Sequence, residues 1–256
     1  MYVSVTGNGP PMVLIHGWGM TGNIWTEIAK SLSKNYELYI IDLPGMGRSE
    51  LIEPYSIDEI VDQIYLSTPN NAIILGWSMG GQIAIMLAVK YSNYINNLIL
   101  ISTTPCFVKK YDWHCAVDEK NLLVFADQLT KNRKKTMLNF LALQLLGSKY
   151  SNKITKDLKR DFIDKDNENY KGLIPALALL RSVDLRTMVS KVKTPSLIIS
   201  GGRDKLTSCD ASLWMQKRIK NSKIKNIETA GHIPFISHKN DVLNVISKFL
   251  GTSNGK

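Results

Sequence analysis

Residues 72–88 of this chain read Ala72-Ile73-Ile74-Leu75-Gly76-Trp77-Ser78-Met79-Gly80-Gly81-Gln82-Ile83-Ala84-Ile85-Met86-Leu87-Ala88. An apolar run, a serine with glycine two residues to either side, and a second apolar stretch predict a strand, a sharp turn and a helix. In a G-x-S-x-G turn the serine takes strained backbone angles, and glycine leaves room for the neighbouring backbone. Ser78 is therefore a candidate nucleophile, expected to stand exposed above a sheet.

Similar apolar runs recur before and after this turn, and segments with helical spacing separate them. The expected strands are 12–15, 36–41, 72–75, 98–101, 196–200 and 225–228, and the expected helices are 25–32, 57–66, 211–219 and 241–250. Alternation of strands and helices predicts a mostly parallel sheet with helices on both faces.

The alternation breaks between Tyr111 and Lys191, where several amphipathic helical segments follow one another without an apolar strand. We therefore expect a helical cap at residues 111–191, inserted into a core made of residues 1–110 and 192–256.

Composition narrows the class of protein further. The hydrophobic fraction is 44%, and the three cysteines lack the spacing of a disulfide framework or a zinc site. The N-terminus shows no signal peptide, and no apolar stretch has the length of a membrane span, so we expect a cytoplasmic protein. The net charge of +10 is unusual and suggests an anionic partner.

A serine hydroxyl needs a base, and the base needs an acid that fixes its tautomer. Asp204 follows the strand at 196–200, and His232 follows the last expected strand. The order serine, acid, histidine is that of α/β hydrolases, and all three residues leave strands at the same edge of the sheet. His238 is the rival base, and Asp42, in a turn, is the rival acid.

Two backbone N–H groups must stabilise the negative oxygen of a tetrahedral intermediate. The turn itself supplies the N–H of Met79, and the loop after the strand at 12–15 supplies the second, for which Trp18 is the candidate. His16 in the same loop is interpreted as a structural residue.

Nine basic residues and a single acid lie between Lys131 and Arg160, which is +8 of the net charge of +10. Within this region Lys149, Lys153, Lys156 and Arg160 follow helical spacing and predict a positive stripe. One alternative is a solvated helix face that has no partner, and another is binding to a membrane surface. Because the positive charge lies beside the predicted active site, we favour docking of an acidic macromolecule. No nucleic-acid recognition motif accompanies the lysines.

Five motifs together resemble a known family over nearly the whole chain. They are His16-Gly17-Trp18-Gly19, Gly76 to Gly81, Phe140-Leu141-Ala142-Leu143-Gln144, Val183-Asp184-Leu185-Arg186 and Pro234-Phe235-Ile236-Ser237-His238. The chain looks like the carboxylesterases of biotin synthesis that demethylate pimeloyl-acyl-carrier-protein methyl ester, which have the α/β-hydrolase fold. Phe140 to Gln144 is the most specific of these motifs.

The resemblance implies a role for each matching residue. Ser78, Asp204 and His232 would form the triad, Trp18 and Met79 would bind the oxyanion and nearby substrate, and Phe140, Leu141, Ala142, Leu143 and Gln144 would line the acyl pocket. Basic cap residues would hold the carrier protein, and the candidates are Lys135, Lys149, Lys153, Lys156 and Arg160. Asn139 and Asn152 stand where basic residues are expected, so the docking set is shifted.

The leading hypothesis is therefore hydrolysis of the methyl ester of pimeloyl-acyl carrier protein to pimeloyl-acyl carrier protein and methanol. The mechanism requires no metal and no organic cofactor, and we expect a monomer without stable membrane association. Two alternatives stay open at this point. One is a general short-chain esterase or carbon–carbon bond hydrolase, and the other is a non-catalytic scaffold or receptor of the same fold.

Overall fold

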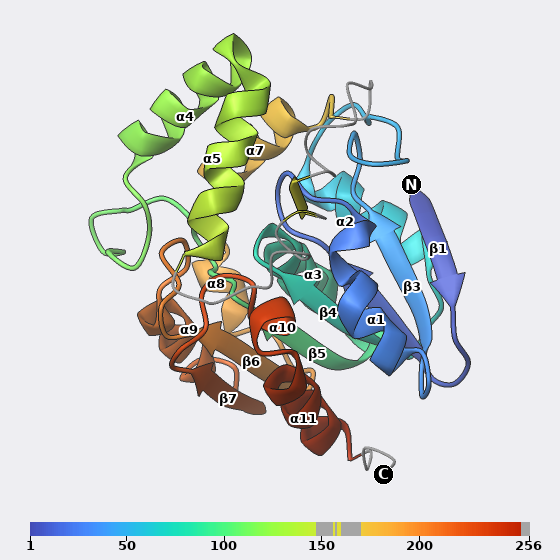
Figure 1. Ribbon diagram of the computed structural model, residues 1–256. Coiled ribbons are helices and arrows are strands. Elements are labelled where there is room, and N and C mark those ends of the chain that lie inside the picture. The colour runs from blue at the N-terminus through green and yellow to red at the C-terminus, as the bar shows by residue number, and fades with distance from the viewer. Residues whose placement is uncertain (147–155, 157, 160–169, 252–256) are drawn as a thin grey trace.

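The computed structural model describes residues 1–146, 156, 158–159 and 170–251 (Figure 1). These residues form a seven-stranded sheet in the order β1-β3-β2-β4-β5-β6-β7, in which β1 is antiparallel to β3 and every other pair is parallel. The strands are β1 (Tyr2–Thr6), β2 (Pro11–Ile15), β3 (Glu37–Asp42), β4 (Ala72–Trp77), β5 (Ile95–Ile101), β6 (Ser196–Gly201) and β7 (Ser222–Ile227).

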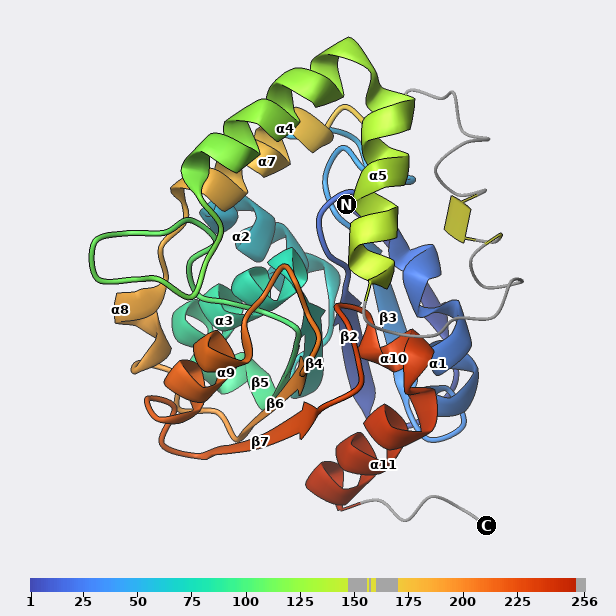
Figure 2. The same cartoon turned by 60° about the vertical axis from the view of Figure 1, so that its left-hand side comes forward.

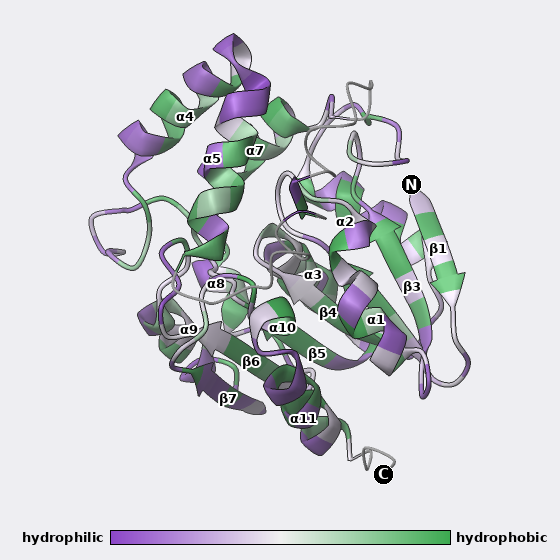
Figure 3. Ribbon diagram, viewed as in Figure 1, coloured by the Kyte–Doolittle hydropathy of each residue, from purple (hydrophilic) through white to green (hydrophobic). Residues whose placement is uncertain are grey.

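Helices cover both faces of this sheet (Figures 1 and 2). One face packs α1 (Thr26–Leu32), α10 (Pro234–Ser237) and α11 (Lys239–Leu250), and the other packs α2 (Ile57–Ser67), α3 (Met79–Lys90) and α9 (Cys209–Gln216). Along β2, Met12 and Leu14 enter one hydrophobic core while Val13 and Ile15 enter the other. Strands buried on both faces read as apolar runs, and β4 and the larger part of β5 are accordingly green in Figure 3.

Between β5 and β6 the chain leaves the sheet for α4 (Glu119–Lys131), α5 (Arg133–Leu145), α7 (Leu173–Ser182) and α8 (Arg186–Val189). The helices α4, α5 and α7 gather beyond the carboxyl ends of the strands (Figures 1 and 2), whereas α8 packs on α3. The first and last residues of this helical segment lie side by side. Leu185 N–H donates to the Pro105 carbonyl at 2.9 Å, and Cys106 and Asp184 form an isolated antiparallel β-bridge.

The expected mostly parallel sheet with helices on both faces is confirmed, but two elements escaped prediction. The edge strand β1 alternates with polar residues and is largely exposed, so it lacks an apolar run. Helix α10 is a single turn that Pro234 begins, too short for a periodic signal. The last strand also starts earlier than expected, at Ser222, because lysines occupy its exposed positions.

Most of the expected positive stripe falls outside the described residues, including Lys149, Lys153 and Arg160. Of that segment the structure describes Lys156 and Lys159, which are exposed, and Leu158, which is buried.

Candidate active site

Ser78 occupies a strained turn between β4 and α3. Its φ of 56° and ψ of −120° lie where residues with a Cβ are rarely found. Gly76 and Gly80 make the turn possible, because a Cβ on the first would overlap the Gly80 carbonyl and a Cβ on the second the Ile15 carbonyl. The serine is only 7% exposed, so the expectation of an exposed Ser78 is wrong. The loop at 16–19 closes over it, with Gly17 against the Ser78 side chain.

A hydrogen-bonded chain joins Ser78 to the two other residues of the expected triad. His232 Nε2 lies 3.1 Å from Ser78 Oγ, and His232 Nδ1 lies 2.7 Å from Asp204 Oδ2. An ionised carboxylate only accepts, so Nδ1 carries the proton and Nε2 is left to accept from the serine hydroxyl. This tautomer is the one in which the imidazole can act as a base toward Ser78.

The Asp204 carboxylate is buried and yet stays ionised. Burial would raise its pKa, but the neighbouring His232 and the hydrogen bonds from His232 and Thr207 outweigh burial, and the pKa is lowered. Thr207 donates its hydroxyl to Oδ2 at 2.6 Å and its N–H to Oδ1 at 3.0 Å, while Leu206 N–H donates to Oδ1 at 2.8 Å. These donors fix the carboxylate for its bond with the histidine.

The loop that carries His232 is tied to the sheet. The Trp77 indole N–H, next to the nucleophile in sequence, donates to the His232 carbonyl at 2.9 Å. Its ring packs on Phe235, which in turn packs on Trp25 with ring centroids 4.5 Å apart. The loop of Asp204 joins the same assembly through Arg203 N–H, which donates to the Ala230 carbonyl at 2.8 Å. The geometry of the triad therefore rests on neighbouring strand ends.

The two expected oxyanion donors are the backbone N–H groups of Trp18, which follows Gly17 in the loop against Ser78, and of Met79, which follows the serine. Within the described part of the chain neither donates to a protein acceptor. Met79 is the first residue of α3, where N–H groups point out of the helix without an internal partner. Donors that stay unpaired at the positive end of a helix can receive a developing oxyanion.

Helix α5 carries the expected acyl-pocket residues on more than one face. Phe140 is half-buried and meets the Trp18 ring, Leu141 is buried in the core, and Gln144 is 1% exposed. Ala142 and Leu143 are exposed. Five consecutive helical residues cannot share one face, so the structure brings three of them inward and leaves two outside.

The buried Gln144 amide has no hydrogen-bond partner among the described residues, on either its oxygen or its nitrogen. Buried amides are nearly always paired, because an unpaired one costs roughly 1–3 kcal/mol. This side chain is therefore a candidate contact for a polar group of a ligand.

His238 and Asp42, the alternative base and acid, form their hydrogen bonds with residues outside the triad. His238 contacts Thr229 Oγ1 at 3.0 Å and Ser237 Oγ at 2.8 Å. Asp42 accepts from Gly22 N–H at 2.6 Å and from Arg48 Nε at 2.7 Å, and so shapes the loops around it.

His16 is a structural residue, as interpreted from the sequence. It is fully buried, with Nδ1 2.8 Å from the Gly17 carbonyl, and it accepts from Leu43 N–H at 2.9 Å. Burial lowers its pKa, so the ring is held neutral.

Exposed cations cluster where α4 turns into α5. They are Lys131, Arg133, Lys134 and Lys135, and the last of these belongs to the expected docking set. Lys131 pairs with Asp127 at 2.8 Å and Arg133 lies over the Tyr170 ring, whereas Lys134 and Lys135 form no ion pair with another described residue.

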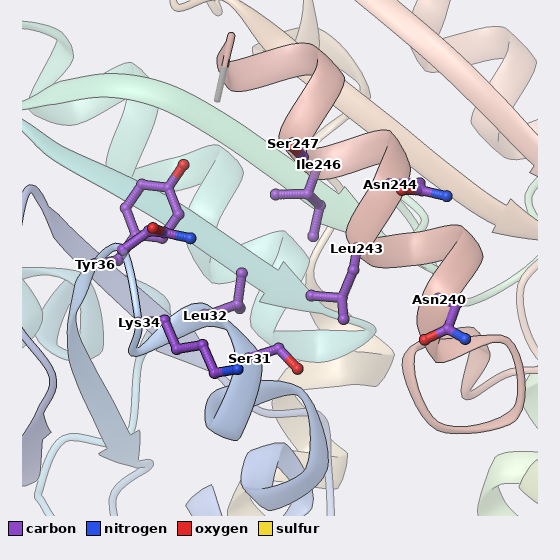
Figure 4. A pocket seen from close by; sticks show the side chains of 10 residues that line it. Ser31, Leu32, Lys34, Tyr36, Asn240, Leu243, Asn244, Ile246 and Ser247 are labelled. Carbon is purple, nitrogen blue, oxygen red and sulfur yellow. The ribbon is translucent and has the colours of Figure 1, made fainter. Parts of the chain in front are cut away.

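Other features of the described residues lie apart from this site. A surface pocket of about 480 Å³ opens between α1 and α11, where Tyr36 and Leu243 line it, and none of the three triad residues reaches it (Figure 4). Within the described ranges, no cluster of His, Cys, Asp and Glu has the composition of a metal site. No helix among those residues is long and apolar enough to span a membrane.

Sequence reasoning missed the residues that hold the triad in place. Thr207 follows Asp204 at the spacing of a local side-chain-to-backbone turn, which is a readable signal. Thr103, whose hydroxyl donates to the Ser78 carbonyl, and Phe125, which packs on Trp18, come from distant parts of the sequence and give no local signal.

Comparisons with known proteins agree with this geometry. Residues 10–239 match the family model described as the alpha/beta hydrolase fold. Solved structures with the same fold include an esterase from Exiguobacterium antarcticum, with a TM-score of 0.90 and 21% identity over 98% of this chain and 95% of that one. A bromoperoxidase from Bacillus anthracis gives a TM-score of 0.86 at 21% identity, over 98% and 95% of the two chains.

Proteins found by sequence similarity share a higher sequence identity with this chain than these solved structures do. Proteins named pimeloyl-[acyl-carrier protein] methyl ester esterase from Xylella fastidiosa (strain 9a5c) and Aeromonas salmonicida are 36% and 34% identical, each covering 98% of this chain and 99% and 100% of the relative. The protein of that name from Nitrosomonas europaea is 32% identical over 93% of this chain and 94% of its own length. The chain belongs to the α/β hydrolase family and, within it, to the family of the pimeloyl-[acyl-carrier protein] methyl ester esterases.

Proposed function

We propose that this chain is a serine esterase that hydrolyses the methyl ester of pimeloyl-acyl carrier protein to pimeloyl-acyl carrier protein and methanol. The observation that carries the proposal is the chain of hydrogen bonds from Ser78 through His232 to Asp204 at the carboxyl edge of the sheet. Full-length relatives named for this reaction support the choice of substrate.

Acylation follows from the tautomer of His232. Nε2 takes the proton of the Ser78 hydroxyl while Oγ attacks the ester carbonyl carbon. The carbonyl oxygen becomes negative and accepts from the backbone N–H groups of Trp18 and Met79. The imidazolium, stabilised by the Asp204 carboxylate, then returns its proton to the methoxy oxygen, and methanol leaves.

Deacylation repeats the same proton transfers with water. His232 Nε2 removes a proton from a water molecule as its oxygen attacks the acyl-enzyme carbonyl, and the same two N–H groups hold the second oxyanion. When the tetrahedral intermediate collapses, the proton on Nε2 returns to Ser78 Oγ. The products are the free carboxyl group of the acyl chain and the starting enzyme.

The segment 111–191 acts in this proposal as the cap over the acyl chain. Phe140 and Leu141 supply apolar wall, and the unpaired Gln144 amide offers a donor and an acceptor to a polar group of the substrate. Ala142 and Leu143, which face outward, belong to the outer surface of the cap.

The cations at the start of α5 support docking of an acidic carrier protein. Arg133, Lys134 and Lys135 fill the first turn of the helix, which contains no acidic residue. A helix N-terminus is positive, so each cation there costs roughly 0.3–1 kcal/mol, and folding alone would favour acidic residues. A negatively charged partner offsets that cost. Lys156 adds a further exposed cation, and Lys149, Lys153 and Arg160 complete the proposed set.

The test is to incubate the purified protein with carrier protein bearing the methyl-esterified pimeloyl group and to weigh the product by mass spectrometry. Loss of the methyl group with the wild type, and none with Ser78→Ala, is the expected result. Ser31→Ala in α1, far from the triad, is the matched control and should hydrolyse the ester at the wild-type rate. Equal loss of methyl with Ser78→Ala would refute the proposal.

A further inference from the structure

The two expected oxyanion donors, the N–H groups of Trp18 and Met79, are held in different ways. Met79 follows the strained turn directly, and Ser78 N–H donates to the Ile101 carbonyl at 3.0 Å, so the core fixes this donor. Trp18 instead lies between Gly17 and Gly19, of which the second has a φ of 71°. The Gly17 carbonyl, in the same peptide unit as Trp18 N–H, lies 2.8 Å from His16 Nδ1 and accepts from Met20 N–H at 3.3 Å, so these contacts hold the donor on one side. On the other side, glycine at position 19 restrains the backbone little.

The Trp18 side chain adds a second set of contacts that fix this residue. The indole N–H donates to the Leu173 carbonyl, at the start of α7, at 3.0 Å. The ring meets Phe125 of α4 and Phe140 of α5 edge-on, with centroids 5.3 and 5.0 Å away. Helices α4, α5 and α7 thus each contribute one contact, and the tryptophan is only 3% exposed.

The residue before α7 is hydrogen-bonded to a loop of the core. Gly172 N–H donates to the Gly45 carbonyl at 2.9 Å, in the loop after β3. The two loops are in close contact, since a Cβ on Gly45 would overlap the Gly172 backbone and a Cβ on Gly172 would overlap the Pro44 carbonyl. The Leu173 carbonyl therefore has a defined position relative to the sheet, and it transmits that position to the indole.

We propose that the cap completes the oxyanion hole, with Phe125 and the Trp18 indole as positioning groups for the Trp18 backbone N–H. The inference rests on the proposed serine mechanism and adds that the position of one of its two oxyanion donors depends in part on α4 and α7. Each aromatic pair of this kind contributes roughly 0.5–1.5 kcal/mol beyond its buried area. If the ring is held less firmly, the oxyanion of the transition state is less stabilised, while the affinity for substrate stays almost unchanged.

Trp18→Phe and Phe125→Leu test this with a small ester such as p-nitrophenyl butyrate. Trp18→Phe keeps a ring but removes the indole donor, and kcat should fall about 10-fold, below the roughly 10²–10³-fold that loss of a whole oxyanion donor costs. Phe125→Leu should lower kcat a few-fold, and KM should stay within about twofold for both. The double variant should lose less than the product of the two effects, because both act through one ring.

Inhibitor affinity separates positioning from a general loss of structure. A trifluoromethyl ketone forms an oxyanion on Ser78, so its affinity should fall by the same factor as kcat, while an alkyl amide of equal length should bind as before. Trp214→Phe is the matched control, since Trp214 meets Trp113 edge-on with ring centroids 5.2 Å apart at a different place in the fold, and it should change neither value.

A rise in KM with unchanged kcat, or equal losses of affinity for both ligands, would overturn the inference. A wild type that cleaves the small ester but not the carrier ester would instead refute only the proposed substrate.

Discussion

The carboxyl edge of the sheet and the cap differ in how they hold their functional groups. At the edge, backbone hydrogen bonds and strand ends fix Ser78, Asp204 and His232, and each step of the chain is a direct bond of 2.7–3.1 Å. In the cap, the contacts are two ring edges about Trp18, one hydrogen bond from its indole to the Leu173 carbonyl, and an amide, Gln144, that has no partner among the described residues. In the proposed mechanism, the core therefore carries the reaction, whereas the cap adjusts it and receives the substrate.

This division predicts different responses to mutation. A change at the edge should abolish turnover on every ester, because all substrates share the triad. A change in the cap should have a smaller effect: it should alter stability, discriminate between the carrier ester and a small ester, or, at Phe125, lower kcat only a few-fold.

Asp204→Asn should have the largest effect. The amide preserves the shape, but it can no longer accept the Nδ1 proton as a carboxylate does, and His232 loses the tautomer that it needs. We expect kcat to fall roughly 10⁴-fold on small and carrier esters alike, measured by steady-state kinetics. Asp210→Asn, an exposed aspartate at the start of α9, is the control and should retain activity.

The same variant makes a prediction about pH. The pKa of Asp204 is lowered in the folded protein, so its ionised form contributes stability above the ordinary carboxyl range, and that contribution is lost as pH falls through the folded-state pKa. The free energy of unfolding of the wild type, measured in urea, should therefore fall more steeply with acid than that of Asp204→Asn. Parallel pH profiles would contradict this assignment.

Gly80→Ala should have the next largest effect, on stability. A Cβ there would overlap the carbonyl oxygen of Ile15 and press on that of His16, and neither backbone group can move without disturbing β2. We expect a loss of about 3 kcal/mol in the free energy of unfolding, by urea titration.

Gly251→Ala is the matched control for that substitution. Gly251 has a φ of 71° but no neighbour within 4 Å of the added Cβ, so only the backbone preference is affected, at about 1 kcal/mol. Equal losses for the two variants would show that overlap at the turn is unimportant.

Most of the fold and the triad could be predicted because their signals are local. Buried parallel strands are apolar runs, the turn at Ser78 has its own glycine pattern, and Asp204 and His232 follow strand ends. The edge strand β1 and the one-turn α10 have no such pattern. Phe125 could not be found either, because its contact with Trp18 joins segments far apart in sequence that only the folded cap brings together.

The outward direction of Ala142 and Leu143 shows a further limit. The motif Phe140 to Gln144 identifies a family segment as a whole, but helical geometry divides it between an inner and an outer face. A motif match alone cannot say which of its residues face inward.

Reversing the charge of Lys134 and Lys135 to glutamate tests the cap as a docking surface. We expect KM for the carrier ester to rise about 10-fold at low salt and by less at high salt, with the small ester unaffected. Stability should not fall, because acidic residues suit the first turn of α5. Lys217→Glu with Lys220→Glu, an equal change of charge near α9, is the control, and a similar rise in KM there would point to net charge instead of a docking surface.

Gln144→Met should have the smallest effect. It should raise the stability of the protein and lower its activity. Methionine fills the same elongated space without leaving a buried amide unpaired, so the free energy of unfolding should rise by about 1 kcal/mol. Activity on the carrier ester should fall, because the substrate loses a polar contact in the cap. Gln128→Met, on the exposed face of α4, should change neither quantity. A less stable Gln144→Met protein would mean that the amide is already satisfied in the free enzyme, and the cap would then resemble the edge of the sheet in holding its polar groups before substrate arrives.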